Sequence, residues 1–86
     1  SQLIRCLDMN SAGTRLVAGT WFGDVLLWDL QRHELVATFQ AHPDIIHAIK
    51  FDPSGQLLAT CSYDQSIRLH QSKDPSIFQG RNSQGR

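Results

Sequence analysis

The sequence is poor in the features that mark several large classes of protein. Its longest apolar runs, such as Leu26 to Trp28, are three or four residues, against the ~20 that a membrane-spanning helix needs. The first residues given do not form a charged-then-apolar leader, although a longer protein could carry one upstream of them. Eight Lys and Arg balance eight Asp and Glu, with no basic run, which argues against a nucleic-acid interface. No apolar stripe with the period of a helix appears, so strands are favoured over helices.

Cysteine is scarce, and the residues that usually hold cofactors are dispersed. Cys6 and Cys61 form no C-x-x-C pair and no dense disulfide framework, so we expect reduced thiols and a cytoplasmic or nuclear setting. No glycine-rich loop precedes a lysine or a helix, as a phosphate site requires. The histidines show no close ligand spacing; they are His33, His42, His47 and His70. The sequence therefore predicts neither a metal ion nor another cofactor.

What the sequence does contain is an internal repeat with a period of 42 residues. Without any gap, residues 4–29 align with residues 46–71, so that apolar positions and turn residues coincide. The identical pairs in this alignment are Ile4 and Ile46, Gly13 and Gly55, Leu16 and Leu58, and Leu27 and Leu69. Two periods cover nearly all of the 86 residues. The repeat therefore defines the architecture of the chain.

Each period contains short apolar runs separated by turn residues, a pattern that indicates four strands. In the first period the expected strands are Ile4 to Met9, Leu16 to Thr20, Val25 to Trp28 and Leu35 to Phe39. In the second they are Ile45 to Phe51, Leu57 to Ser62 and Ile67 to His70, with Ile77–Phe78 as the only available fourth strand. We predict an all-β chain with one unit in 1–40, a second in 41–79 and a disordered polar tail in 80–86.

A four-stranded unit of this length, repeated in tandem, resembles a blade of the WD-repeat, β-transducin-like propeller family. The segment from Ala41-His42 to the turn Asp52-Pro53-Ser54-Gly55 is similar to the Gly-His start and the Phe-Ser-Pro-Asp-Gly turn of the family. Trp28-Asp29 matches the Trp-Asp ending of a repeat. The departures are Ala41 for the glycine, Phe22 for the turn aspartate and His70-Gln71 for the second Trp-Asp. The resemblance implies two four-stranded antiparallel blades of a larger β-propeller.

The resemblance also implies a buried hydrogen-bonded relay of His, Ser or Thr, Asp and Trp within a blade. On this pattern His42, Ser62 and Asp64 take three of the roles, and His70 replaces the tryptophan. Such a relay stiffens a sheet when every member is satisfied. The same residue types occur in hydrolase triads, but Ser62 lies within a strand, and no strained turn or oxyanion donor accompanies it. We therefore expect a scaffold and not an enzyme.

In a propeller of this family, the turns that follow the second strand and precede the first lie on one rim, which its members commonly use to bind proteins. Trp21, Phe22 and Tyr63 are large rings in those turns, and such rings anchor partners when they are desolvated. Arg5 and His47, near the same rim, can add polar contacts. The alternatives are that a ring covers a neighbouring blade and that Arg5 and His47 are ordinary solvated residues.

The chain offers two blades, whereas closed propellers use ~4 to 8. Because each blade has apolar residues on both faces, a lone pair would expose two broad hydrophobic surfaces. We expect either a fragment of a longer protein or a unit that assembles into a homo-oligomeric ring. Our first interpretation of function is a protein–protein interaction scaffold whose rim loops meet a protein partner. The alternative is a purely structural pair of blades, with recognition elsewhere.

Overall fold

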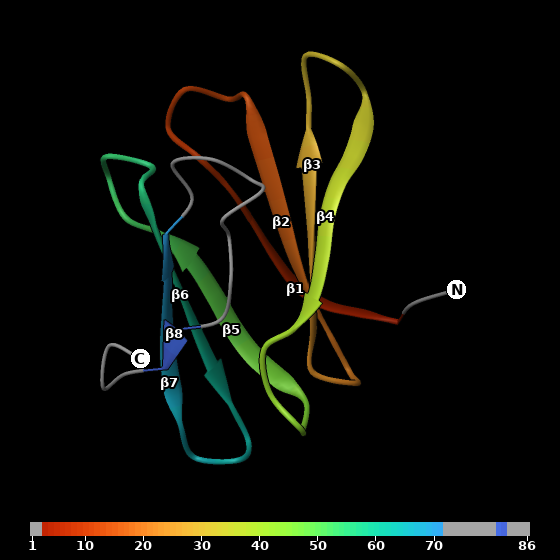
Figure 1. The fold of residues 1–86 in the computed structure, drawn as a ribbon, viewed down its shortest axis with the longest axis vertical. Coiled ribbons are helices and arrows are strands. Elements are labelled where there is room, and N and C mark those ends of the chain that lie inside the picture. Colours follow the sequence, from red (N-terminus) through yellow and green to blue (C-terminus); the bar gives the residue numbers. More distant parts are fainter. Residues whose placement is uncertain (1–2, 72–80, 83–86) are drawn as a thin grey trace.

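The computed structural model describes residues 3–71 and 81–82, which form two antiparallel sheets (Figure 1). The first sheet contains, in order, β1 (Ile4–Met9), β2 (Arg15–Thr20), β3 (Asp24–Asp29) and β4 (Glu34–Gln40). The second contains β5 (Ile46–Phe51), β6 (Leu57–Ser62), β7 (Ile67–Gln71) and β8 (Arg81–Asn82). Neighbours in each sheet are consecutive in sequence, and the prediction of an all-β chain with two antiparallel sheets is confirmed. The described residues include no helix long and apolar enough to span a membrane.

The strands follow the predicted bounds to within one residue, except for the last one. Its predicted position, Ile77–Phe78, lies outside the described residues. The strand that pairs with β7 is Arg81–Asn82, which places Arg81 opposite Leu69. The prediction of a disordered tail is therefore wrong for these two residues. Backbone hydrogen bonds hold this strand, and they leave no apolar pattern from which a sequence could predict it.

The two sheets repeat each other in backbone detail as well as in strand order. Leu16 lies opposite Trp28, and Leu58 lies opposite His70, in equivalent registers. The first strand of each sheet has a register shift at the same place, between Ile4 and Cys6 in β1 and between Ile46 and Ala48 in β5. The period of 42 residues read from the sequence is therefore a structural period.

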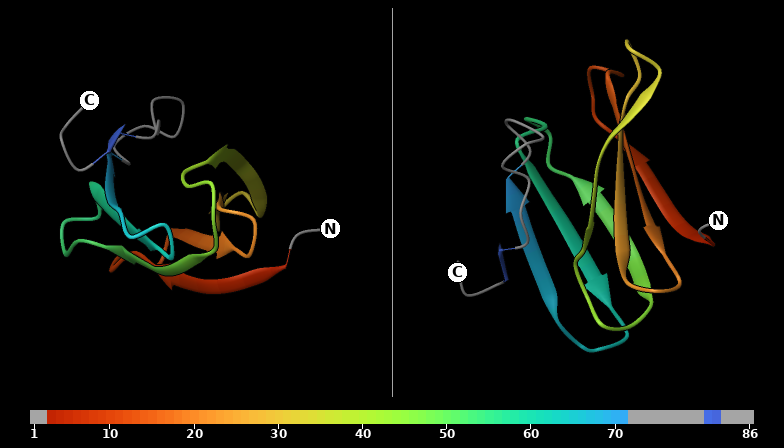
Figure 2. Two further views of the ribbon diagram at one scale, coloured as in Figure 1. Left: turned by 90° about the horizontal axis from the view of Figure 1, so that it is seen from below. Right: turned by 45° about the vertical axis from the view of Figure 1, so that its right-hand side comes forward.

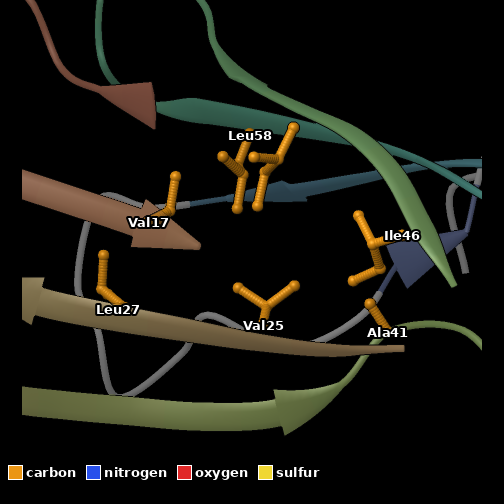
Figure 3. Packing of buried hydrophobic residues seen from close by; sticks show 7 residues of the cluster. Val17, Val25, Leu27, Ala41, Ile46 and Leu58 are labelled. Carbon is orange, nitrogen blue, oxygen red and sulfur yellow. The ribbon is translucent and has the colours of Figure 1, made fainter. Parts of the chain in front are cut away.

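The hydrophobic core lies between the sheets, where β5 runs beside β1 and β2 (Figure 2). Val17 and Leu27 project from the first sheet toward Ile46 and Leu58 of the second, and all four side chains are fully buried (Figure 3). Burying a side chain of this size contributes about 1.5 to 3 kcal/mol. This cluster holds the two blades in a fixed relation to each other.

Gly19 and Asp8 bring the two blades together at close range. A Cβ atom at Gly19 would lie 2.5 Å from Cγ2 of Ile46, so only glycine lets β2 approach β5 this closely. Further along the same contact, the Asp8 carboxylate accepts a hydrogen bond from the backbone N–H of Phe51 at 2.8 Å. The interface between the blades is therefore apolar at its centre and hydrogen-bonded at its edge.

Candidate functional site

The β2–β3 turn lies at the lower end of the molecule in Figure 1 and has its backbone satisfied from within. The hydroxyl of Thr20 accepts hydrogen bonds from the backbone N–H groups of Phe22 at 3.1 Å and Asp24 at 3.0 Å. Gly23 supplies the left-handed conformation that the turn needs, with φ 87°. Because the backbone closes the turn, the rings of Trp21 and Phe22 are not required inside it, and they are 46% and 58% exposed.

The β6–β7 turn at the same end repeats this construction (Figure 1). The hydroxyl of Ser62 accepts a hydrogen bond from the backbone N–H of Asp64 at 3.1 Å and donates one to the carbonyl of Ile45 at 2.8 Å. Gln65 takes the left-handed conformation, with φ 71°. The ring of Tyr63 projects from the tip and is 53% exposed. The two turns thus present large rings at equivalent places.

Arg5 and His47 lie in the register shifts of β1 and β5, and each contacts the ring of its own blade. The guanidinium carbon of Arg5 lies 5.6 Å from the centre of the Trp21 ring, within the range of a cation–π interaction. The rings of His47 and Tyr63 are 5.3 Å apart. A bulge changes the direction in which a side chain leaves a strand, which explains why residues inside strands reach the turn. We call Arg5, Trp21, Phe22, His47 and Tyr63 the rim surface.

A polar chain lies beneath the Tyr63 turn and centres on the buried side chain of His42. Its Nε2 lies 2.7 Å from the hydroxyl of Thr60, which in turn lies 3.2 Å from Nε2 of His70. Its Nδ1 lies 3.1 Å from Oδ2 of Asp64 and 3.1 Å from the hydroxyl of Ser66. The Ser66 hydroxyl donates to Oδ1 of Asp64 at 2.6 Å. The polar chain therefore connects the segment that precedes β5 with β6, the β6–β7 turn and β7.

The partners in this polar chain assign the position of each proton. Burial alone would raise the pKa of Asp64, but hydrogen bonds from Ser66 and His42 outweigh this effect and lower the pKa to about 2. The ionised carboxylate therefore accepts Nδ1–H from His42, whose Nε2 must accept the hydroxyl proton of Thr60. The Thr60 oxygen is then free to accept Nε2–H from His70. This tautomer assignment rests on the geometry of the partners.

The structure corrects one member of the relay expected from the sequence. The hydroxyl that bonds His42 belongs to Thr60 and not to Ser62, whose own hydroxyl closes the rim turn. Both residues lie on one face of β6, two residues apart, so the sequence pattern alone does not separate them. Sequence reasoning also missed Ser66, although a hydroxyl two residues after Asp64 is a signal for a turn of this kind. His42, Asp64 and His70 lie together in the chain.

The site offers no arrangement for metal or thiol chemistry within the described residues. No group of three or more His, Cys, Asp or Glu side chains among them is placed to hold a metal ion. Burial raises the pKa of the Cys6 thiol, against the smaller lowering effects of a backbone hydrogen bond from Gly19 and the charge of Arg5. The thiol form of Cys6, which is the less reactive one, is thus favoured.

Comparison with known proteins agrees with this geometry. The model of the WD domain, G-beta repeat, matches residues 33–71. Among solved structures, the chain superimposes on the Cps50 (Swd1) β-propeller domain of Myceliophteria thermophila with a TM-score of 0.77, at 21% identity, over 94% of this chain and 28% of that chain. The chain is a segment of a WD-repeat β-propeller. WD-repeat propellers are generally non-catalytic scaffolds that mediate interactions between proteins.

Several curated relatives of this WD-repeat segment are much longer than it. ROOT INITIATION DEFECTIVE 3 of Arabidopsis thaliana is 33% identical over 77% of the segment and 15% of that protein. The pre-rRNA-processing protein crb3/ipi3 of Schizosaccharomyces pombe is 30% identical, with the same two coverages. The Arabidopsis thaliana transcriptional corepressor LEUNIG_HOMOLOG is 27% identical over 85% of the segment and 9% of that protein. The segment thus spans a small part of these relatives.

Proposed function

We propose that the WD-repeat segment binds a protein partner through the rim surface. The observation that carries this proposal is the repeated pairing of a cationic or imidazole side chain with an exposed ring, Arg5 with Trp21 and His47 with Tyr63. Aromatic and arginine side chains are the commonest energetic anchors of protein interfaces. Since each ring is already oriented by its neighbour and by a closed turn, binding would cost little side-chain entropy.

The polar chain supports the rim surface from below. Asp64 directly follows Tyr63 and is held by His42 and by Ser66. A satisfied buried network of this kind limits motion of the turn that carries it. The proposed role of His42, Thr60, Asp64 and His70 is therefore to position the Tyr63 turn and not to contact the partner.

Site-specific crosslinking in the full-length protein tests the rim surface. A photoreactive amino acid is placed at Phe22, and a matched one at Leu35, which is 48% exposed at the opposite end of the blade. We expect defined crosslinked products from position 22 that Trp21→Ala removes without lowering the melting temperature. Equal products from both positions, or loss of folding in Trp21→Ala, would contradict the proposal and favour a ring that only packs against the scaffold.

We also propose that this segment catalyses no reaction. Thr60 is buried and its proton is committed to His42, while the hydroxyl of Ser62 is committed to the carbonyl of Ile45. Neither hydroxyl lies on an exposed strained turn, where a nucleophile would be placed. Hydrolytic activity of the purified chain that Ser62→Ala or Thr60→Val abolished would overturn this view.

The structural alternative is supported by the outer faces of the two blades. Val25 and Leu27 are fully buried against the second blade, whereas Ile67 and Leu69, at the equivalent positions of that blade, are exposed. These side chains would be buried by a further blade, supplied either by a longer chain or by another copy in a ring. The mass in solution separates these two cases, and a stable monomer of two blades would contradict both.

A nuclear location, of the two settings expected from the sequence, has support from the names of relatives. They include a transcriptional corepressor, a pre-rRNA-processing protein and, in Mus musculus, one of the subunits of chromatin assembly factor 1. We propose that the present protein also acts in the nucleus. Imaging of the full-length protein with a fluorescent tag tests this, and exclusion from the nucleus would contradict it.

A further inference from the structure

A small open pocket lies beside the polar chain, between the link that joins β4 to β5 and Arg68 of β7. Its volume is about 190 Å³, and its lining residues are Gln40, Ala41, His42, Pro43 and Arg68. The usual pockets for drug-sized molecules are about 300 to 1,000 Å³, so this one is too small for a nucleotide or a comparable ligand. It has room for one small group at the end of a side chain.

Arg68 gives the pocket its chemistry. The Nε atom of its guanidinium is buried and makes no hydrogen bond within the described part of the chain. The ion pairs that arginines form within the described residues join Arg15 with Asp29 and Arg32 with Glu34, and neither includes Arg68. Leaving a buried charged donor without an acceptor is costly, so the pocket favours any group that supplies one.

The other polar groups near the pocket leave the Arg68 guanidinium available. The imidazole of His42 lines the pocket, but both of its ring nitrogens are engaged, with Asp64 and Ser66 on one side and Thr60 on the other. The Asp64 carboxylate is likewise bound to His42 and Ser66. Neither group is free to serve as the acceptor for Arg68 Nε.

We propose that the pocket binds one carboxylate group of an acidic side chain from the protein partner. A guanidinium is planar and always charged, and it binds a carboxylate through two parallel hydrogen bonds. Nε is one of the donors that such a pair uses, and it makes no hydrogen bond among the described residues. Because Nε is buried, the carboxylate pairs with it when the Arg68 side chain turns toward the pocket that it lines. This proposal rests on the proposed function, because it names the chemistry that a partner would bring to the segment.

The test follows the Arg68 Nε–H resonance by NMR in the full-length protein. The resonance is identified by its absence in Arg68→Lys. The probes are N-acetyl-glutamate amide, the neutral N-acetyl-glutamine amide, and N-acetyl-phosphoserine amide. We expect a saturable shift with the glutamate compound and none with the glutamine compound. In Arg68→Gln, where the titration is followed at the backbone N–H of His42, we expect binding to weaken about tenfold or more. Arg32→Gln, which removes an exposed arginine, should leave binding unchanged.

Two other outcomes of the titrations overturn the proposal. An Nε–H resonance that no probe shifts shows that the pocket is not an anion site. A shift with the phosphoserine compound alone would assign the pocket to a phosphorylated side chain in place of a carboxylate. Crosslinking from the rim surface is independent of these titrations. A saturable shift without crosslinks at position 22 would therefore leave the carboxylate pocket standing and refute the rim proposal.

Discussion

The two blades have the same backbone arrangement and differ in the side chains that they bury. Thr60, Asp64 and His70 of the polar chain in the second blade correspond to Ala18, Phe22 and Trp28 in the first. The first blade thus lacks the Thr60 hydroxyl and the Asp64 carboxylate on which the polar chain of the second blade depends. Both sheets nevertheless have the same bulge, the same turns and the same strand order. The polar chain is therefore not needed to form a blade.

What the blades do share is the chemistry of the rim turn. A hydroxyl residue, Thr20 or Ser62, accepts backbone hydrogen bonds from residues two to four positions later. A left-handed residue, Gly23 or Gln65, follows three positions after it. This comparison shows that local turn bonds shape the blade, while the polar chain ties the second rim turn to the blade entry. Substitutions at matched positions of the two blades test this division.

The largest effect is expected from Gly23→Ala. The carbonyl of Gly23 accepts hydrogen bonds from the N–H groups of Ala41 and His42 at 2.9 and 3.1 Å, and an added Cβ would overlap the carbonyl of His42. We expect the free energy of unfolding to fall by on the order of 3 kcal/mol or more. Gln65→Ala, at the equivalent position, should cost less than about 1 kcal/mol. Urea denaturation measures both free energies of unfolding. Equal losses would show that the close contact of Gly23 with His42 does not make its turn more sensitive than the turn at Gln65.

Thr60→Val should have the next largest effect, because it removes the hydroxyl and keeps the shape. His42 Nε2 and His70 Nε2 would both lose the Thr60 oxygen in a buried site, which costs about 2 to 3 kcal/mol. Ser62→Ala breaks only turn bonds and should cost about 1 kcal/mol. Thermal unfolding of the two variants compares them. A larger loss of stability for Ser62→Ala would mean that Ser62, as the sequence pattern predicted, and not Thr60 is the hydroxyl member of the relay.

Asp64 should make the free energy of unfolding depend on pH, whereas Phe22, at the equivalent position of the first blade, has no group that titrates. Its pKa is lowered from 3.8 to about 2 in the folded protein, so its contribution is present above pH 3.8 and is lost as the pH falls toward 2. We expect Asp64→Asn to flatten the stability curve in this window, measured by unfolding at a series of pH values. Phe22→Asn adds no titratable group and should leave the curve unchanged in shape. An unchanged curve for Asp64→Asn would contradict the hydrogen bonds that Ser66 and His42 make to this carboxylate.

The smallest effect is expected from Arg15→Gln. Arg15 Nη1 lies 3.2 Å from Asp29 Oδ2 across β2 and β3, and the equivalent pair in the second blade, Leu57 and Gln71, carries no charge. Arg15 is 27% exposed, so water and salt reach this pair and keep its contribution small. We expect the melting temperature to fall by about 2 °C or less in low salt and not at all in high salt. A larger, salt-independent fall would mean that this pair is structural in the first blade.

Much of the fold could be predicted from the sequence because the repeat encodes it twice. Gly13 and Gly55 both take φ above 70° in equivalent turns, and the strands between the turns were predicted to within one residue. The strand Arg81–Asn82 was not predicted, because its pairing depends on backbone groups. The rim residues were identified by type and place, but their role as binding residues stays a prediction.

The sequence by itself determined the strand order, the register within each blade and the exposure of Trp21 and Tyr63, since neighbouring residues and closed turns decide these features. Only the tertiary structure decided that His42 reaches Thr60 in place of Ser62, that Arg5 lies over Trp21, and that Arg68 borders an open pocket. These contacts join segments far apart in the chain. They depend on differences of a few ångströms in how strands and sheets pack, which the order of residues along one strand does not specify.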